Sequence, residues 1–394
     1  MRILCLTSRL PYPPNRGDRL RAFHFIEHLS QEHDLTLVSF IADGSQRAHL
    51  APLQEYCQNI EVVLMRRPQS VASVAANLWR REPLQTLYYR SGRMRRLVEG
   101  ILASRSFDAA YVHLFRMAPY LANHPGLYRV IDLTDVISRE ISRSLQYRDP
   151  ISRMIYRIER PRIERYECWV GRTFEETWLI SEFDAEALSA RCPGANVQIV
   201  TNGVDTERFY LTGGPPEPNS IIFVGHMRVF HNVDAACHLA EEVLPLIRRR
   251  VPDASLTIVG ANPDPAVQRL GTVPGVTVTG FVPDLNAALN RSQVFAAPLR
   301  FAAGVQNKVL EAMATARPVV TTALVNEGLR AVPGQQILIA DDASSTAQQI
   351  VALLQDEDLR VRIGHAGLAF VREKYSWERA VDRMRHIEAQ LGTG

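Results

Sequence analysis

The sequence predicts an α/β protein made of two doubly wound, Rossmann-like domains in tandem. With 394 residues, the chain is longer than the roughly 250–300 residues that one hydrophobic core usually supports. In both halves, short apolar runs rich in β-branched residues alternate with segments of helical periodicity, which indicates parallel sheets covered by helices on both faces. The Gly- and Pro-rich stretch TNGVDTERFYLTGGPPEPNS (201–220) between the halves is typical of a linker.

The linker sets the expected domain limits: a first domain over 1–205, a second over 206–373, and a C-terminal amphipathic helix over 374–394. In the first half, strands are expected at 2–8, 35–40, 61–65, 109–113, 128–133, 176–181 and 197–201, with helices near 17–31, 46–58 and 136–170. In the second half, strands are expected at 221–225, 255–260, 276–282, 293–299, 317–322 and 336–340, with helices near 233–249 and 305–316.

The composition excludes several classes of protein. With 46% hydrophobic and 22% charged residues, the chain is typical of globular proteins. No window holds the ~18 uninterrupted apolar residues that a membrane span needs. The N-terminal run MRILCLTSRL (1–10) has no small-residue cleavage site, so we interpret it as a first strand and not as a signal peptide.

The cysteines are odd in number, scattered, and contain no C-x-x-C pair. This pattern argues against a disulfide framework or a structural zinc site and favours a reduced, cytosolic protein. The five positions are Cys5, Cys57, Cys168, Cys192 and Cys237.

A candidate anion site follows the strand expected at 293–299. Two facing doubly wound domains would form one cleft between them, and their ligands bind at the carboxyl ends of the strands. There Gly304 permits close approach to the backbone, and a helix begins near 305–307 whose free N–H groups favour an anion. The chain has only two lysines among 45 basic residues, and one of them, Lys308, lies in the first turn of this helix with Glu311 one turn on.

Lys308 suits a phosphate and Glu311 suits sugar hydroxyls, so the pair matches a nucleoside diphosphate with its ribose. The alternative is an ordinary i,i+3 pair on the helix surface, which would contribute only a few tenths of a kcal/mol.

Several stretches, in order along the chain, resemble family-4 retaining glycosyltransferases of GT-B architecture. AGVQNKVLEAMATARPVV (303–320) resembles their donor-binding segment, and NGVDTERF (202–209) resembles the start of their second domain. PYPPNRGDRLRAFHF (11–25), GVQNKVLEAMA (304–314) and the stretch 223–260 further resemble the sugar transferases found with exopolysaccharide and exosortase (PEP-CTERM) loci. The resemblance covers essentially the whole chain, and it implies a C-terminal helix that returns to the first domain.

The resemblance assigns residue roles in the donor site. Lys308 would hold the diphosphate and Glu311 the ribose, beside the helix start at Gly304, Val305, Gln306 and Asn307. Many members have a sugar-binding glutamate where this chain has Ala303, so the resemblance does not identify the donor sugar. Where members often carry an Arg and a Lys, this chain has His226 and His231. Either the diphosphate relies more on Lys308 and the helix start, or Arg228 substitutes, with Arg300 as a further candidate; each could instead be an ordinary surface residue.

In the first domain, the loop after the first strand is expected to face the acceptor. It contains Arg16 and Gly17, followed by Asp18, which would bind an acceptor hydroxyl or, alternatively, cap the next helix. His113 and Asp132 end the strands at 109–113 and 128–133, so both are expected to face the cleft as catalytic candidates, although a polar residue closing a strand is often a simple turn residue.

The resemblance implies glycosyl transfer from a nucleotide sugar with retention, without cofactor or metal. QDEDLR (355–360), the only D-x-D string, is interpreted as a solvated helix start. A dehydrogenase is excluded by the lack of G-x-G-x-x-G. A sugar-nucleotide epimerase of the same architecture and a non-catalytic nucleotide-sugar-binding protein remain alternatives.

The segment 66–96 carries eight arginines and one acidic residue, Glu82, with aromatic residues between them. This pattern favours an anionic membrane surface, so we expect a cytoplasmic protein, peripheral on the inner membrane face, whose acceptor is a glycan or lipid-linked. The alternative is a solvated Arg-rich helix. No nucleic-acid-binding motif accompanies the charge.

Overall fold

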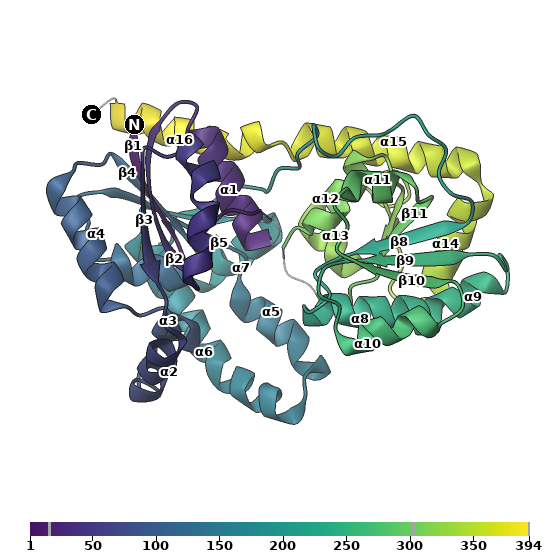
Figure 1. The fold of residues 1–394 in the computed structure, drawn as a ribbon, viewed down its shortest axis with the longest axis horizontal. Coiled ribbons are helices and arrows are strands. Elements are labelled where there is room, and N and C mark those ends of the chain that lie inside the picture. The colour runs from purple at the N-terminus through teal and green to yellow at the C-terminus, as the bar shows by residue number, and fades with distance from the viewer. Residues whose placement is uncertain (15–16, 302–303, 393–394) are drawn as a thin grey trace. The chain divides into compact units, whose positions relative to one another are not determined.

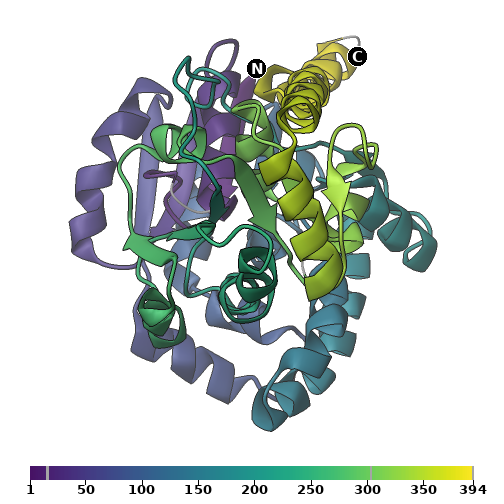
Figure 2. The ribbon, with the colours of Figure 1, turned by 90° about the vertical axis from the view of Figure 1, so that its right-hand side faces the viewer.

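The computed structural model describes residues 1–14, 17–301 and 304–392. The chain forms two compact units, which we describe separately (Figures 1 and 2). Unit 1 is Met1–Thr201 together with the residues from Trp377 onward, and unit 2 is Asn202–Ser376. The limits predicted from the sequence, 205 and 373, lie a few residues from these.

Unit 1 is built on a seven-stranded parallel sheet in the order β3-β2-β1-β4-β5-β6-β7. The expected strands are all present: β1 (Arg2–Thr7), β2 (Asp34–Ile41), β3 (Asn59–Leu64), β4 (Ala109–His113), β5 (Tyr128–Thr134), β6 (Glu176–Leu179) and β7 (Val197–Ile199). Leu4 and Leu6 belong to one apolar cluster while Ile3 and Cys5 belong to another. Because alternate residues of a strand face opposite sides, both faces of this sheet are buried, which explains why its strands are almost wholly apolar.

The helices of unit 1 are α1 (Gly17–Leu29), α2 (Arg67–Ala76), α3 (Leu84–Tyr88), α4 (Gly92–Ser104), α5 (Ile137–Ser144), α6 (Pro150–Thr173), α7 (Glu182–Arg191) and α16 (Trp377–Gly392). The long helix expected over 136–170 is two helices. Asp149 accepts hydrogen bonds from the backbone N–H groups of Ile151 and Ser152 and so caps α6, with Pro150 at the first helical position. The helix expected over 46–58 is two short 3₁₀ turns, η1 (Gly44–His49) and η2 (Ala51–Glu55).

The C-terminal helix α16 belongs to unit 1, although it follows unit 2 in the chain. It packs along α1, and Trp377, Met384 and Ile387 join the apolar cluster on that face of the sheet (Figure 1). Trp377 stacks on His24 of α1, with ring centroids 4.6 Å apart.

The expectation that the cysteines form no disulfide is wrong. Cys168 in α6 and Cys192 at the end of α7 are bonded, with Cα atoms 5.1 Å apart. The two cysteines are 24 positions apart, with β6 and α7 between them, so only the packing of α7 against α6 brings the two together.

Unit 2 is built on a six-stranded parallel sheet in the order β10-β9-β8-β11-β12-β13. Its strands are β8 (Ser220–Val224), β9 (Ser255–Val259), β10 (Val276–Gly280), β11 (Val294–Ala297), β12 (Val319–Thr321) and β13 (Leu338–Ile339). Its helices are α8 (Phe230–His238), α9 (Leu244–Arg248), α10 (Pro265–Arg269), α11 (Leu285–Asn290), α12 (Asn307–Ala314), α13 (Ala323–Leu329), α14 (Ala343–Gln355) and α15 (Glu357–Lys374). A π-helical turn, η5 (Leu239–Val243), separates α8 from α9, where Pro245 lacks the N–H that a continuous α-helix would use.

These two sheets confirm the predicted fold class, an α/β protein with two doubly wound, parallel-sheet domains. Among the described residues, no helix combines the length and apolar character that crossing a membrane requires.

Candidate functional site

The loop between β11 and α12 contains a glycine where the helix begins, so a ligand can approach the backbone closely there. Gly304 has φ +54°, a left-handed conformation that glycine adopts without strain. A Cβ on Gly328 of α13 would lie 2.6 Å from the Gly304 carbonyl oxygen, so α13 supports this loop at contact distance. Gln306 occupies the N-cap position of α12, and its side chain accepts no hydrogen bond from the helix N–H groups. The first turn of α12 therefore keeps backbone donors that a ligand can use.

Lys308 lies in this first turn and is held by a residue from another helix, α8. Its Nζ donates a hydrogen bond to Oδ1 of Asn232 in α8, and it lies 5.5 Å from the centroid of the Phe223 ring. Asn232 is 3% exposed, and its Nδ2 donates to the His226 carbonyl at 3.2 Å. Burial lowers the pKa of Lys308 to about 7, against the opposing field of Glu311. An anion beside Nζ would restore the charge that burial disfavours.

Glu311 lies one helical turn beyond Lys308 without pairing with it. Burial raises the pKa of Glu311 to about 7, and Arg208 and Lys308 oppose that rise. No ion pair joins Lys308 to Glu311 among the residues the structure describes, and the Glu311 carboxylate accepts no hydrogen bond from any of them. Among the described residues, the two side chains therefore do not form the i,i+3 ion pair of the alternative interpretation, and both residues are half-buried.

Two glycines bring the loops after β8 and β9 together behind Lys308. A Cβ on Gly260 would lie 1.8 Å from the Gly225 carbonyl oxygen, and a Cβ on Gly225 would lie 2.8 Å from Cγ of Asn232. Side chains at either position would push the backbone or Asn232 away. The sequence analysis did not identify Asn232, because its burial and its contact with Lys308 depend on the packing of α8 beside α12.

The other donor-site candidates differ in whether another described side chain already binds them. Arg300 forms a bidentate ion pair with Asp234 of α8, so its charge is already balanced. Arg228 is exposed in the β8–α8 loop, and no hydrogen bond or ion pair ties its side chain to another described residue. Asn307 accepts a hydrogen bond from Asn202 Nδ2 at 2.8 Å.

Three further residues complete the expected donor site. Val305 is 5% exposed, His226 lies half-buried in the β8–α8 loop, and His231 lies in α8 near the Phe301 ring. Ala303 and Arg16 fall outside the described residues.

In unit 1, Asp132 is not at the surface where the sequence analysis expected it. It is completely buried, and Oδ2 accepts hydrogen bonds from Arg21 Nε and Tyr111 Oη, both at 2.6 Å. Its Oδ1 accepts from the Thr134 backbone N–H at 3.0 Å. Since both carboxylate oxygens are occupied by the protein, the geometry supports a structural role for Asp132, which fixes α1 to β4 and β5.

His113 lies beside Asp132 in the register of β4 and β5. It is 2% exposed, and burial lowers its pKa to about 4, so the imidazole is neutral at pH 7. Its Nε2 has no hydrogen-bond partner among the described residues. This makes His113 the stronger of the two strand-end candidates for accepting a proton.

Gly17 and Asp18 form the first turn of α1. Asp18 lies inside the helix and not at its N-cap position, so the capping alternative does not apply. The carboxylate accepts a hydrogen bond from Arg9 Nη1 at 2.8 Å, and Arg116 Nη2 lies 3.9 Å from it. Asp18 thus sits at the carboxyl edge of the sheet, between two arginines.

One group of possible metal ligands occurs in the described part of the chain: His24, Glu27 and His28 of α1. Glu27 already hydrogen-bonds His24 Nδ1 at 2.8 Å, and His28 Nδ1 lies 2.9 Å from the His24 carbonyl oxygen. Hydrogen bonds within α1 therefore explain why these three side chains lie together. The sequence analysis had not proposed them as a metal site.

Comparison with known proteins agrees with this geometry. Residues 218–356, which include the β8–α8 loop and all of α12, match the family described as Glycosyl transferases group 1. Over 95% of its length the chain is 22% identical to an uncharacterized 44.6 kDa protein in the cps region of Klebsiella pneumoniae, covering 96% of that protein. It is 26% identical over 210 residues to the phosphatidyl-myo-inositol mannosyltransferase of Mycobacterium leprae, a match that spans 51% of this chain and 55% of that enzyme.

Solved structures share the fold over the whole chain. Sucrose-phosphate synthase from Thermosynechococcus elongatus superposes with a TM-score of 0.75 at 15% identity, covering 100% of both chains. Anabaena HepE in complex with UDP gives a TM-score of 0.70 at 13% identity, covering 99% of this chain and 100% of the other. A glycosyltransferase from Rickettsia africae gives 0.70 at 13% identity, covering 99% and 98%. The chain therefore has the two-domain GT-B fold, and its residues 218–356 are similar to glycosyl transferases of group 1.

Proposed function

We propose that this protein is a retaining glycosyltransferase of family 4 that moves a sugar from a nucleoside diphosphate donor to a cell-surface glycan acceptor. One observation carries the proposal: Lys308, at the start of α12, is oriented by the neutral amide of Asn232 and does not pair with Glu311. A desolvated lysine without a protein anion beside it is suited to bind an anionic ligand.

The donor diphosphate would lie at the N-terminus of α12. There it would accept hydrogen bonds from the free backbone N–H groups and the Lys308 ammonium, with Arg228 as a further cation. Glu311 would accept hydrogen bonds from the ribose hydroxyls. When the glycosidic bond to the diphosphate breaks, negative charge develops on the leaving phosphate, and these preorganised donors stabilise it. We propose that this stabilisation suffices without a metal or other cofactor.

The acceptor is proposed to be a lipid-linked or polysaccharide glycan bound by unit 1. Two relatives support this: the similar protein from the Klebsiella cps region and the mycobacterial phosphatidyl-myo-inositol mannosyltransferases. We accordingly place the protein in exopolysaccharide synthesis, on the cytoplasmic face of a membrane, with the Arg-rich segment 66–96 on the lipid surface. HepE binds UDP, which makes uridine nucleotides the first donors to test.

A thermal-shift screen against a panel of nucleotide sugars tests the donor site, because a bound ligand stabilises the folded state by RT ln(1 + [L]/Kd). We expect one donor to raise the melting temperature of the wild-type protein. Lys308→Met should abolish that rise and leave the melting temperature of the free protein unchanged or higher. The proposal fails if Lys308→Met binds the same donor as tightly as the wild type.

A second assay separates transfer from epimerisation. The protein is incubated with its donor alone and then with donor and a lipid-linked glycan acceptor. We expect glycosylated product only in the second mixture. Interconversion of nucleotide sugars without acceptor would instead identify an epimerase.

A further inference from the structure

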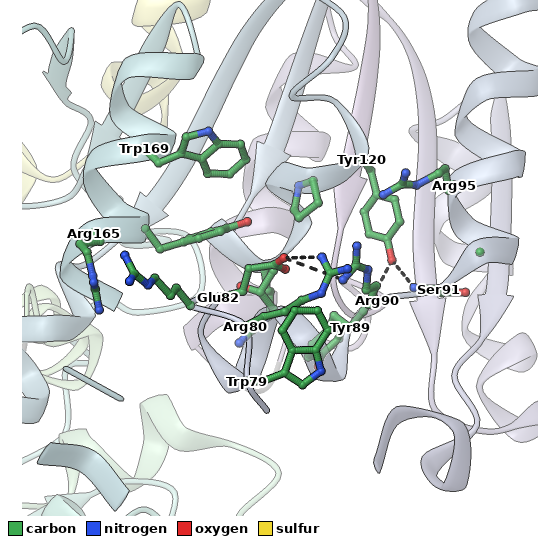
Figure 3. Close-up of a pocket in the computed structure, with 16 residues that line it drawn as sticks. Trp79, Arg80, Glu82, Tyr89, Arg90, Ser91, Arg95, Tyr120, Arg165 and Trp169 are labelled. Atoms are coloured by element: carbon green, nitrogen blue, oxygen red, sulfur yellow. Dashed lines mark hydrogen bonds and ion pairs between the residues drawn. The ribbon is translucent and has the colours of Figure 1, made fainter. Parts of the chain in front are cut away.

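Unit 1 contains a cavity of about 940 Å³ that the donor site does not use. It lies between the segment after α2, helices α3 and α4, the 3₁₀ turn η3 (Phe115–Tyr120), and α6. Figure 3 shows Trp169 and Arg165 of α6 on one side, Tyr120 and Arg95 on the other, and Trp79 at the lower rim. A cavity of this size accommodates a small-molecule ligand.

The cavity is strongly cationic, and we call it the arginine pocket. Its only acidic residue among those described is Glu82, which lies 3.4 Å from Arg80 and 3.8 Å from Arg90. Arg81 and Arg95 make no hydrogen bond or ion pair with the other described residues. The arginines that line it are Arg80, Arg81, Arg90, Arg95, Arg116 and Arg165. Since one carboxylate faces six guanidinium groups, the pocket has a surplus of positive charge that an anionic ligand would balance.

Two buried hydroxyl groups in the lining lack hydrogen-bond partners. Thr86 is 2% exposed and Tyr166 is 8% exposed, and neither Thr86 Oγ1 nor Tyr166 Oη makes a hydrogen bond with any residue that the structure describes. Burial raises the pKa of Tyr166, and the Thr86 hydroxyl acts against that rise, but the two groups do not meet the geometry of a hydrogen bond with each other. Unsatisfied buried hydroxyls are costly, and a ligand oxygen in the pocket would satisfy both.

An exposed apolar surface lies on α6, on the N-terminal side of the residues with which this helix lines the pocket. α6 exposes an apolar stripe at i, i+3, i+4 and i+7, which consists of Ile151, Met154, Ile155 and Ile158 and alternates with arginines. Beyond the end of α2, Trp79 is 76% exposed while it lines the pocket. Exposed apolar side chains at helical spacing beside arginines are typical of helices that lie in a membrane interface.

Arg116 connects the pocket to the carboxyl edge of the unit 1 sheet. Arg116 lines the pocket, and its Nε donates to Ser8 Oγ, just after β1, at 2.9 Å. The same guanidinium has its Nη2 3.9 Å from Asp18. A ligand head group in the pocket would therefore lie one side chain away from the loop at which the sequence analysis expected the acceptor.

We propose that the arginine pocket binds the phosphate or diphosphate head of an amphiphile, whose apolar chain lies along the exposed stripe of α6 in the membrane interface. Arg81 and Arg95 pair with the phosphate, and Thr86 and Tyr166 donate to its oxygens. The identification of this amphiphile as the acceptor rests on the proposed function. The proposal that the arginine pocket binds the amphiphile does not. An acidic polysaccharide would explain the arginines but not the four exposed apolar residues of α6.

The head-group site is tested with dodecyl phosphate below its micelle concentration, by calorimetric titration of the full-length protein. Wild type should bind dodecyl phosphate, and should bind neither dodecyl maltoside nor inorganic phosphate with comparable affinity. Arg81→Gln/Arg95→Gln should weaken binding roughly thirtyfold, as two lost phosphate contacts imply. Arg93→Gln/Arg96→Gln, the matched control on α4 outside the pocket, should have no effect. Equal losses in the two pairs would show non-specific charge attraction and overturn the proposal.

Tyr166→Phe and Thr86→Val separate ligand contact from a structural role. Because neither hydroxyl has a partner in the free protein, these variants should unfold at the wild-type temperature or higher. Both should nevertheless bind dodecyl phosphate several-fold more weakly. A variant that loses stability but keeps its affinity would contradict the assignment.

The apolar stripe is tested by co-sedimentation with vesicles of phosphatidylcholine containing one quarter phosphatidic acid. Met154→Ser/Ile158→Ser should reduce vesicle binding, whereas Val332→Ser/Val361→Ser, equally exposed in unit 2, should not. Binding of an acidic polysaccharide with no binding of dodecyl phosphate would replace the amphiphile with a glycan. Lys308→Met should leave dodecyl phosphate binding intact, so the donor site and this pocket can fail independently.

Discussion

Lys308 Nζ donates a hydrogen bond to Oδ1 of Asn232, which joins α12 to α8 through two residues that are 76 positions apart in sequence. The amide orients the ammonium group without neutralising it, whereas a carboxylate in the same place would cancel its charge. With Glu311 unpaired one turn away, the site keeps a positioned cation and a separate acceptor, as a diphosphate and a ribose would require.

Changing Asn232 should weaken donor binding through Lys308. We expect Asn232→Ala to lower the affinity for the donor roughly three- to tenfold, because one orienting hydrogen bond is lost. Asn232→Asp should lower it further, because a carboxylate would pair with Lys308 and repel the phosphates. Calorimetric titration with the donor found in the thermal-shift screen measures both, and tighter binding by Asn232→Asp would contradict this role.

Donor affinity should fall as pH rises above about 7. The pKa of Lys308 in the free protein is about 7, and the diphosphate favours the protonated amine, so binding takes up a proton once the free amine is neutral. Linkage then gives a loss approaching tenfold per pH unit above that pKa. Titrations from pH 6 to 9 measure the slope. Glu311→Gln should retain it and Lys308→Met should remove it; a flat wild-type profile would refute the assignment.

Arg228 and Arg300 should differ as phosphate ligands. Arg228 has no partner that its binding to phosphate would have to break, so Arg228→Gln should reduce donor affinity several-fold without a change in melting temperature. Arg300 is held by Asp234, so Arg300→Gln should change donor affinity little. The reverse order of effects would show that the Arg300–Asp234 pair opens on binding.

Removing Asp132 should destabilise unit 1. Arg21 and Asp132 are both fully buried, so Asp132→Asn would leave the guanidinium without its counter-charge and cost about 3–5 kcal/mol. The matched control is Asp382→Asn, whose exposed pair with Arg385 in α16 should contribute little to stability. Urea unfolding measures both. A stable Asp132→Asn protein that has lost only its activity would restore the catalytic assignment.

The sequence predicted the donor-side residues for a local reason. A buried parallel strand is a short apolar run, and the residues just after it must lie at the carboxyl edge of the sheet, which is how Gly304, Lys308 and Glu311 were found. The same rule placed His113 and Asp132 at strand ends, but it does not specify whether such a side chain points into the interior. Asp132 turns inward because Arg21, 111 residues away, and Tyr111 supply its hydrogen bonds.

The residues that sequence reasoning missed depend on contacts between distant segments. In the sequence, Asn232 cannot be distinguished from an ordinary helix residue. Its role follows only from the packing of α12, which places Lys308 against it. Cys168 and Cys192 lack the spacing of any common motif, yet the packing of α7 on α6 joins them. The arginine excess of 66–96 was visible, but a pocket required Arg165 and Tyr166 from α6 on its opposite wall.

By itself, the sequence determined the α/β class and the two parallel sheets, because the period and length of apolar runs depend only on neighbouring residues, and it predicted the strand end at which we propose that an anion binds. The tertiary structure decided which polar side chains are satisfied by the protein and which are left for a ligand. Whether a polar side chain is satisfied depends on hydrogen-bond partners that other helices and strands supply. A missing partner costs free energy in a buried site because no water can replace it there.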